Sequence, residues 1–109
     1  MSTKSGERNT RKLRQSLYKA ILALQTPAEC ESFLQDLCTP AELEALVDRW
    51  EVVQLVDQGV PYRQIQQKTR VSTATITRVA RALSHGAGGY RKIIDRIQNR
   101  IKETKGKAS

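Results

Sequence analysis

Residues 62–83, which read YRQIQQKTRVSTATITRVARAL, decide the fold that the sequence predicts. Ile65 is the inward-facing apolar residue of a short first helix, and Val71 is the apolar residue of the turn that follows. The second helix carries apolar residues at the i, i+3 and i+7 positions of one face, namely Ile76, Val79 and Leu83. Two short helices joined by a tight turn form a helix-turn-helix, and we predict one over residues 62–83.

The second of these helices begins with side chains that suit a DNA groove. Ser72 is expected to cap it, because its hydroxyl can accept a hydrogen bond from the backbone N–H near Thr75. The side chains after the cap are short, so the backbone can approach base edges closely, and Thr can contact bases directly. The residues predicted to bind DNA are Arg63, Lys68, Arg70, Ser72, Thr73, Ala74, Thr75, Thr77, Arg78 and Arg81.

These predicted contacts divide by role. The residues expected to contact phosphates are Arg63, Lys68, Arg70 and Arg81, and those expected to read or approach bases are Ser72, Thr73, Ala74, Thr75 and Thr77. Arg70 counts against the motif, because helix-turn-helix turns often carry Gly and a left-handed Arg would cost roughly 1 kcal/mol. The alternative is two ordinary amphipathic helices with a solvated basic face.

The charge of the chain is segregated along its length. The 109 residues carry a net charge of +8, but residues 26–59 hold eight acidic side chains and one basic one. Residues 60–84 hold five basic side chains and no acidic one, and residues 1–25 and 85–109 are also basic. A basic character that served solubility alone would not be distributed in this way, so the pattern favours a polyanionic partner such as double-stranded DNA.

The remainder of the chain reads as helices. Thr26-Pro27-Ala28-Glu29 and Thr39-Pro40-Ala41-Glu42 are two helix-start signals, each with Thr as the N-cap and Glu reaching back. They follow an amphipathic helix over about 11–24, and the helix from Pro40 is expected to end at Gly59 and to be central, with apolar residues on several sides. No segment has the period of a strand, so the fold class is all-α.

The predicted organisation is a single helical domain over 11–103, with a flexible basic arm at 1–10 and a basic tail at 104–109. A last helix begins near Tyr90 and carries a stripe of four isoleucines, Ile93, Ile94, Ile97 and Ile101. The stripe can face a partner or pack back on its own chain, and the sequence leaves both open.

Other functional classes find little support. Cys30 and Cys38 have no CxxC spacing and read as reduced, packed thiols, and the lone His85 lies in a Gly-rich loop, so neither a metal site nor a catalytic residue is expected. The chain is therefore not expected to be an enzyme. No signal peptide or membrane-spanning run is evident, which predicts a cytoplasmic protein that is nucleoid-associated when bound to DNA.

At this point the sequence resembles the Trp repressor family, and more closely its Trp-repressor-like branch, which bears the Tyr62 and Gly88-Gly89-Tyr90 features. The resemblance rests on TPAELEAL at 39–46, Arg49, Gly59 and ATITR at 74–78. It implies a six-helix, intertwined homodimer with a helix-turn-helix, which represses transcription at palindromic operators.

The resemblance also implies a corepressor pocket. Members of the family hold tryptophan between two arginines, at positions matched here by Arg49 and Arg78, with a threonine matched by Thr39 at the pocket edge. This sequence departs from the pattern at Val79, where the amino-acid-binding members have Gly, and at Ala82, where they have Ser. Tryptophan is therefore not the expected corepressor, and whether another amino acid or any small effector binds stays open.

The sequence predicts a sequence-specific DNA-binding transcriptional regulator, most simply a repressor that acts as a homodimer on a palindromic operator. Two alternatives remain. In one, the protein binds nucleic acid non-specifically, chiefly through its basic termini. In the other, it is a helical protein-interaction module without a DNA role, which binds its partner through the isoleucine stripe.

Overall fold

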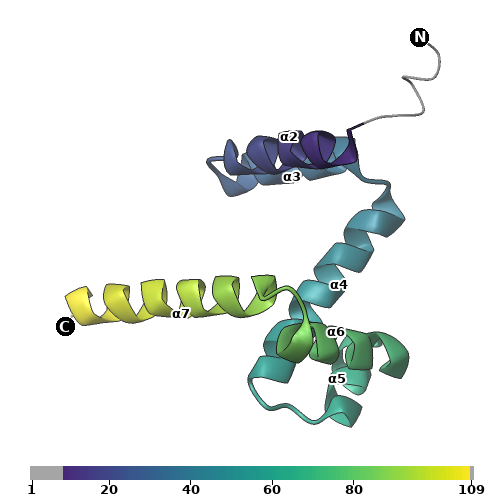
Figure 1. Cartoon of the computed structure of the whole chain (residues 1–109). Helices are drawn as coiled ribbons and strands as arrows, with labels where there is room; N and C mark the ends of the chain where they lie inside the picture. Colours follow the sequence, from purple (N-terminus) through teal and green to yellow (C-terminus); the bar gives the residue numbers. More distant parts are fainter. Residues whose placement is uncertain (1–8, 109) are drawn as a thin grey trace. The chain divides into compact units, whose positions relative to one another are not determined.

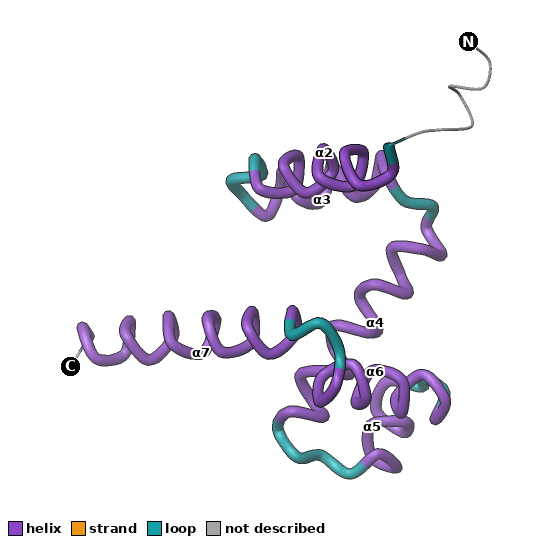
Figure 2. Tube along the Cα trace, viewed as in Figure 1, coloured by secondary structure: helices purple, strands orange, loops and turns teal. Residues whose placement is uncertain are grey.

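The computed structural model describes the backbone of residues 9–108 and the side chains of residues 9–103. All regular elements of this described part are α-helices joined by short loops, and it contains no strand (Figures 1 and 2). The helices are α2 (Thr10–Leu22), α3 (Pro27–Leu37), α4 (Pro40–Asp57), α5 (Tyr62–Thr69), α6 (Thr73–His85) and α7 (Gly89–Ala108). The prediction of an all-α, six-helix fold is confirmed. In the same part of the chain, no helix is long and apolar enough to span a bilayer.

The two predicted helix-start signals are confirmed, with one difference between them. The backbone N–H of Glu42 donates to Thr39 Oγ1 at 3.1 Å, and Glu42 Oε1 accepts from the Thr39 N–H at 2.8 Å. Thr26 caps α3 in the same way, but Glu29 reaches one residue further back and accepts from the Gln25 N–H at 2.9 Å. These bonds satisfy N–H groups that a helix start otherwise leaves unpaired.

The end of α4 is also set locally. Gly59 has a φ of +83°, which a residue with a Cβ rarely adopts. Its N–H donates to the Val56 carbonyl at 3.0 Å, and the Val60 N–H donates to the Leu55 carbonyl at 3.1 Å. This pair of bonds is the Schellman motif, so the predicted helix end at Gly59 is confirmed.

The chain divides into two compact units, Met1–Leu43 and Glu44–Ser109. Residues 1–8 of the predicted arm lie outside the described residues; Asn9 caps α2 by accepting from the Lys12 N–H at 3.1 Å. At the other end α7 continues to Ala108, so it includes most of the segment predicted as a tail. The single domain over 11–103 stays a prediction.

The first unit has almost no interior of its own. Neither α2 nor α3 contains a buried residue. Its exposed large apolar side chains are Leu13, Leu17, Tyr18, Ile21, Leu22 and Leu37. The apolar side of the amphipathic helix predicted over about 11–24 is therefore present, but the single chain leaves Leu13, Leu17 and Ile21 exposed.

The second unit holds the hydrophobic core. Its buried cluster joins the C-terminal half of α4 to the helix-turn-helix and the start of α7, and consists of Val52, Val53, Leu55, Ile65, Val71, Ile76, Val79 and Ile94. The expectation that α4 is packed on several sides holds only for that half. Leu46 and Val47, one to two turns earlier, are 43% and 57% exposed in the single chain.

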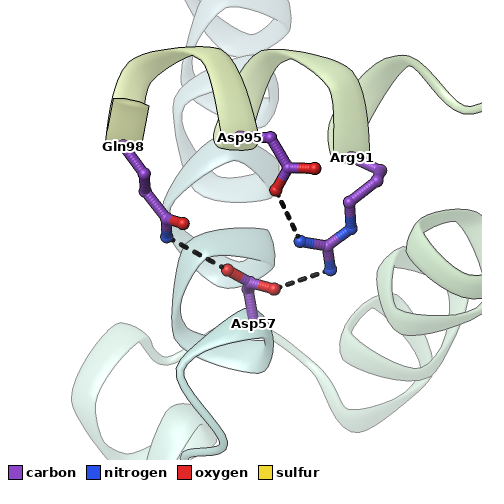
Figure 3. A network of polar contacts seen from close by, with 4 residues as sticks. All are labelled: Asp57, Arg91, Asp95 and Gln98. Carbon is purple, nitrogen blue, oxygen red and sulfur yellow. Dashed lines mark hydrogen bonds and ion pairs between the residues drawn. The ribbon is translucent and has the colours of Figure 1, made fainter. Parts of the chain in front are cut away.

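A polar network fixes the start of α7 to the end of α4 (Figure 3). Arg91 donates to Asp57 at 2.6 Å and to Asp95 at 3.1 Å, and Gln98 Nε2 donates to Asp57 at 3.4 Å. The hydrogen bonds from Arg91 to Asp57 and then to Asp95 raise the pKa of the guanidinium. Of the four isoleucines on α7, Ile94 packs into this chain's core, whereas Ile93, Ile97 and Ile101 are exposed.

Candidate nucleic-acid interface

The turn of the helix-turn-helix contains a left-handed residue that is not glycine. Arg70 follows the end of α5 with φ 64° and ψ 13°, and its N–H donates to the Gln66 carbonyl at 2.7 Å. The conformation that such turns usually give to Gly is therefore adopted here by Arg. A non-glycine residue in this region persists where its surroundings over-determine the backbone.

Sequence reasoning missed a residue of this turn, Thr69. Its hydroxyl donates to the Ile65 carbonyl at 2.7 Å and accepts from the Val71 N–H at 3.1 Å. A Thr at the last position of a helix can bond backward to the i−4 carbonyl and forward to the i+2 N–H, and that position was the available signal. Val71 itself is buried, as predicted for the residue that fills the turn.

The start of α6 confirms the predicted cap. Ser72 Oγ accepts from the Thr75 N–H at 3.2 Å and donates to Thr75 Oγ1 at 3.0 Å. Because the Thr75 oxygen accepts this bond, its own O–H remains a donor that a base edge can take up.

The helix α6 separates its apolar and polar residues cleanly. Ile76, Val79 and Ala80 are buried on one side. All of the predicted DNA contacts except Thr75 are exposed, and Thr75 is half-buried at the helix start. The helices α5 and α6 pack against each other, so the phosphate and base contacts that the sequence predicted lie on one helix pair (Figure 1). Their roles in DNA binding stay predictions.

The cations of this helix pair form no ion pair with a carboxylate of residues 9–103. The ion pairs of Asp57 and Asp95 are with Arg91, on α7. The guanidinium and ammonium groups of Arg63, Lys68 and Arg81 are therefore not neutralised by residues 9–103. Such groups suit the phosphate contacts that position a protein on a duplex.

The residues of the predicted corepressor pocket are Thr39, Arg49 and Arg78, and their role in ligand binding stays a prediction. Arg49 lies in an open hollow of about 300 Å³ between α4 and the turn, whose lining is Ala45, Asp48, Arg49, Arg70, Val71, Ser72 and Thr75. Arg78 is not part of that lining. Thr39, in the first compact unit, is the N-cap of α4.

Two hollows that sequence reasoning did not find lie against Trp50. The apolar one, of about 510 Å³, is lined by Trp50, Ala82, Ala87, Gly89, Tyr90 and Ile93. The other, of about 220 Å³, lies between α4 and α7. Ala82 thus faces a different hollow from Arg49, and Val79 is only 2% exposed within the core. Within residues 9–103, no group of three or more His, Cys, Asp or Glu is placed to hold a metal ion.

The chain matches known proteins over most of its length. The family model described as Trp repressor protein matches residues 12–98. The uncharacterized protein YerC of Bacillus subtilis is 38% identical over 91 residues, which cover 84% of this chain and 88% of that protein. A Trp operon repressor homolog of Mannheimia succiniciproducens is 33% identical over 75 residues, 68% of this chain and 74% of the homolog. The crystal structure of a TrpR like protein from Eubacterium eligens superposes with a TM-score of 0.77 at 37% identity, covering 80% of this chain and 90% of that one.

Proposed function

Because this chain belongs to the Trp repressor family, a family of DNA-binding regulators, we propose that it is a sequence-specific transcriptional repressor. The observation that carries the proposal is the division of α6, which buries Ile76 and Val79 and exposes short and basic side chains on the other side. A helix anchored in this way presents its first turn to the major groove.

In this proposal the two kinds of contact come from different parts of the helix pair. Arg63, Lys68, Arg70 and Arg81 contact phosphates and set the position of the protein on the duplex. The short side chains at the start of α6 read bases, and Thr75 uses the O–H that its bond from Ser72 leaves available. Arg78, exposed and outside the Arg49 hollow, adds a phosphate contact.

We also propose that the protein acts as a homodimer on a palindromic operator. Two sets of apolar side chains support this, because the single chain leaves both exposed. They are Leu13, Leu17, Ile21 and Leu22 on α2, and Ile93, Ile97 and Ile101 on α7. A two-fold dimer would place its α6 helices in half-sites about 34–36 Å apart, one turn of DNA.

We further propose that L-tryptophan does not bind to this protein as a corepressor. The branched side chain of Val79 is part of the core, and Arg78 does not join Arg49 in its hollow. Isothermal titration with L-tryptophan tests this point, and micromolar binding at one ligand per chain would contradict it. The same titration with other amino acids tests whether one of them is an effector.

The function itself is tested by selecting bound duplexes from a random DNA library, without any added effector. We expect a palindromic consensus, and we expect the protein to hold that site when scrambled DNA is in excess. Thr75→Ala should change the preferred base at one position per half-site. Lys12→Ala, which removes a side chain from the basic N-terminal region, should leave the consensus unchanged.

Equal affinity for the selected and scrambled duplexes would favour the non-specific alternative. No binding to either duplex would favour the protein-interaction module. Light scattering of the same sample measures whether two chains are present.

A further inference from the structure

We propose that Thr69 is the positioning residue of the DNA-reading helix: its hydroxyl fixes the turn that orients α6, in which Arg70 occupies the left-handed position that such turns usually give to glycine. The proposal rests on the proposed function, because it concerns how sequence discrimination is achieved. It assigns a role to a side chain that is itself half-buried behind the interface.

The Thr69 hydroxyl connects α5 to Val71, which lies in the turn just before α6. On one side it donates to the carbonyl of Ile65, and on the other it accepts the N–H of Val71. Both of these residues belong to the hydrophobic core, where Ile65 is fully buried and Val71 nearly so. The two bonds therefore tie the turn to the part of the molecule that moves least.

The left-handed backbone of Arg70 explains why the turn needs these two hydrogen bonds. At φ 64° a glycine would be unstrained, whereas an Arg returns toward the ordinary helical or extended regions unless it is held. Arg70 is held by its own bond to Gln66 and by the Thr69 hydroxyl, which bonds to residues on either side of it. Arg70 also lines the hollow that Ser72 and Thr75 line at the start of α6, so its backbone conformation is set directly beside the first turn of the reading helix.

The consequence for DNA is selective. Ser72 directly follows Val71, so a change in the turn shifts the cap and the short base-reading side chains with it. Short side chains cannot compensate for a misplaced backbone. Long Arg and Lys side chains on α5 can still reach phosphates after a small shift. Loosening the turn should therefore reduce discrimination between sequences more than it reduces affinity for DNA in general.

The test compares Thr69→Val, which keeps the shape but removes the hydroxyl, with Thr69→Ser, which keeps the hydroxyl. For each protein we would measure the ratio of affinities for the selected operator and a scrambled duplex at one salt concentration. We expect Thr69→Val to lower this ratio about tenfold, because it removes two hydrogen bonds and leaves the Val71 N–H unpaired, and Thr69→Ser to keep it. Thr26→Val is the matched control, because it removes the same hydroxyl from a capping bond in the other compact unit.

An unchanged ratio in Thr69→Val would overturn the proposal. So would an equal loss in Thr26→Val, which would reveal a general effect of lower stability, or a failure of Thr69→Ser to keep the ratio. Amide hydrogen exchange at Val71 without DNA separates the two levels of inference. If the wild-type protein does not discriminate between duplexes, the proposed function fails. If the Val71 amide is nevertheless protected in the wild type and loses this protection in Thr69→Val, the Thr69 hydroxyl still holds the turn.

Discussion

The α2–α3 pair and the helix-turn-helix pair are both made of two consecutive short helices, yet they are stabilised in different ways. The α2–α3 pair has side-chain caps at both helix starts and not one buried residue. The α5–α6 pair has one such cap, at Ser72, but buries Ile65 and Ile76 completely. Caps determine where a helix begins, whereas burial determines where it lies. The second pair can therefore be positioned by its own chain, and the first has its apolar face available for another.

The largest expected effect is on the core of the second pair. Ile76→Ala should lower the free energy of unfolding by about 2–5 kcal/mol, because it removes three carbons from a fully packed site. Ile21→Ala, the same substitution at a residue that is 46% exposed, should cost less than about 1 kcal/mol in a dilute single chain.

Urea unfolding at several protein concentrations measures both values. In a homodimer the Ile21→Ala loss should grow with concentration, because it acts on association. If the two substitutions lower the free energy of unfolding equally and independently of protein concentration, both helix pairs are buried within the single chain to the same degree.

Caps are the feature in which the two regions should behave alike. Thr26→Ala and Ser72→Ala each remove a side-chain acceptor from a helix N–H and should each cost about 1 kcal/mol of unfolding free energy. Their effects on DNA should differ, since only Ser72 begins the reading helix. Chemical denaturation gives the first comparison and operator titration the second. A Thr26→Ala variant that lost operator affinity as strongly as Ser72→Ala would remove the distinction.

Removing one charge from each region should have a smaller effect, on the salt dependence of DNA binding. Arg63→Ala should make the slope of log K on log salt shallower by about 0.9 for each phosphate contact removed, and so by about 1.8 for the two copies of Arg63 in the proposed homodimer. Arg14→Ala, which removes the same charge from α2, should leave the slope unchanged. Binding isotherms at four or more salt concentrations measure it. If both variants change the slope equally, DNA contacts the basic N-terminal helix as well, as in the non-specific alternative.

The smallest expected effect is on the exposed network at the end of α4. Arg91→Leu should lower the Tm slightly relative to Arg96→Leu, because Arg91 bonds to both Asp57 and Asp95. The pKa of Arg91 is raised in the folded state, so its contribution is complete below the ordinary arginine pKa and is lost only as the pH rises through the raised value. The Tm difference should therefore persist from neutral to moderately alkaline pH in thermal scans. A difference that disappeared in that range would point to another group.

The features that sequence predicted well are those governed by near neighbours. The caps at Thr26, Thr39 and Ser72 and the end at Gly59 depend on residues at most five positions away, and all are confirmed. The buried side of α6 follows from its period. The spacing of apolar residues along a helix shows which side is apolar, but it does not show which part of the molecule covers that side. For this reason α4 was expected to be packed along its whole length, whereas Leu46 and Val47 are exposed in the single chain.

Two parts of the candidate site were beyond sequence pattern for a different reason. The hydroxyl of Thr69 matters because it bonds in two directions at once, and that depends on the backbone of Arg70, whose conformation its residue type disfavours. Arg49 and Arg78 were grouped by resemblance, and that grouping stays a prediction; the structure adds that Arg49 lines a hollow together with Arg70 and Ser72 of the turn. Which residues share a hollow is decided by the tertiary packing of α4 against the turn.

Trp50 gives the protein an optical reporter of its own. It is the single tryptophan of the chain, and it lines both the apolar hollow that it shares with Ala82 and Tyr90 and the hollow between α4 and α7. Indole emission shifts to shorter wavelength when water is displaced from the ring. A second chain or a small apolar molecule that fills either hollow should therefore shift the intrinsic Trp50 emission to shorter wavelength, and the measurement needs neither a label nor a substitution.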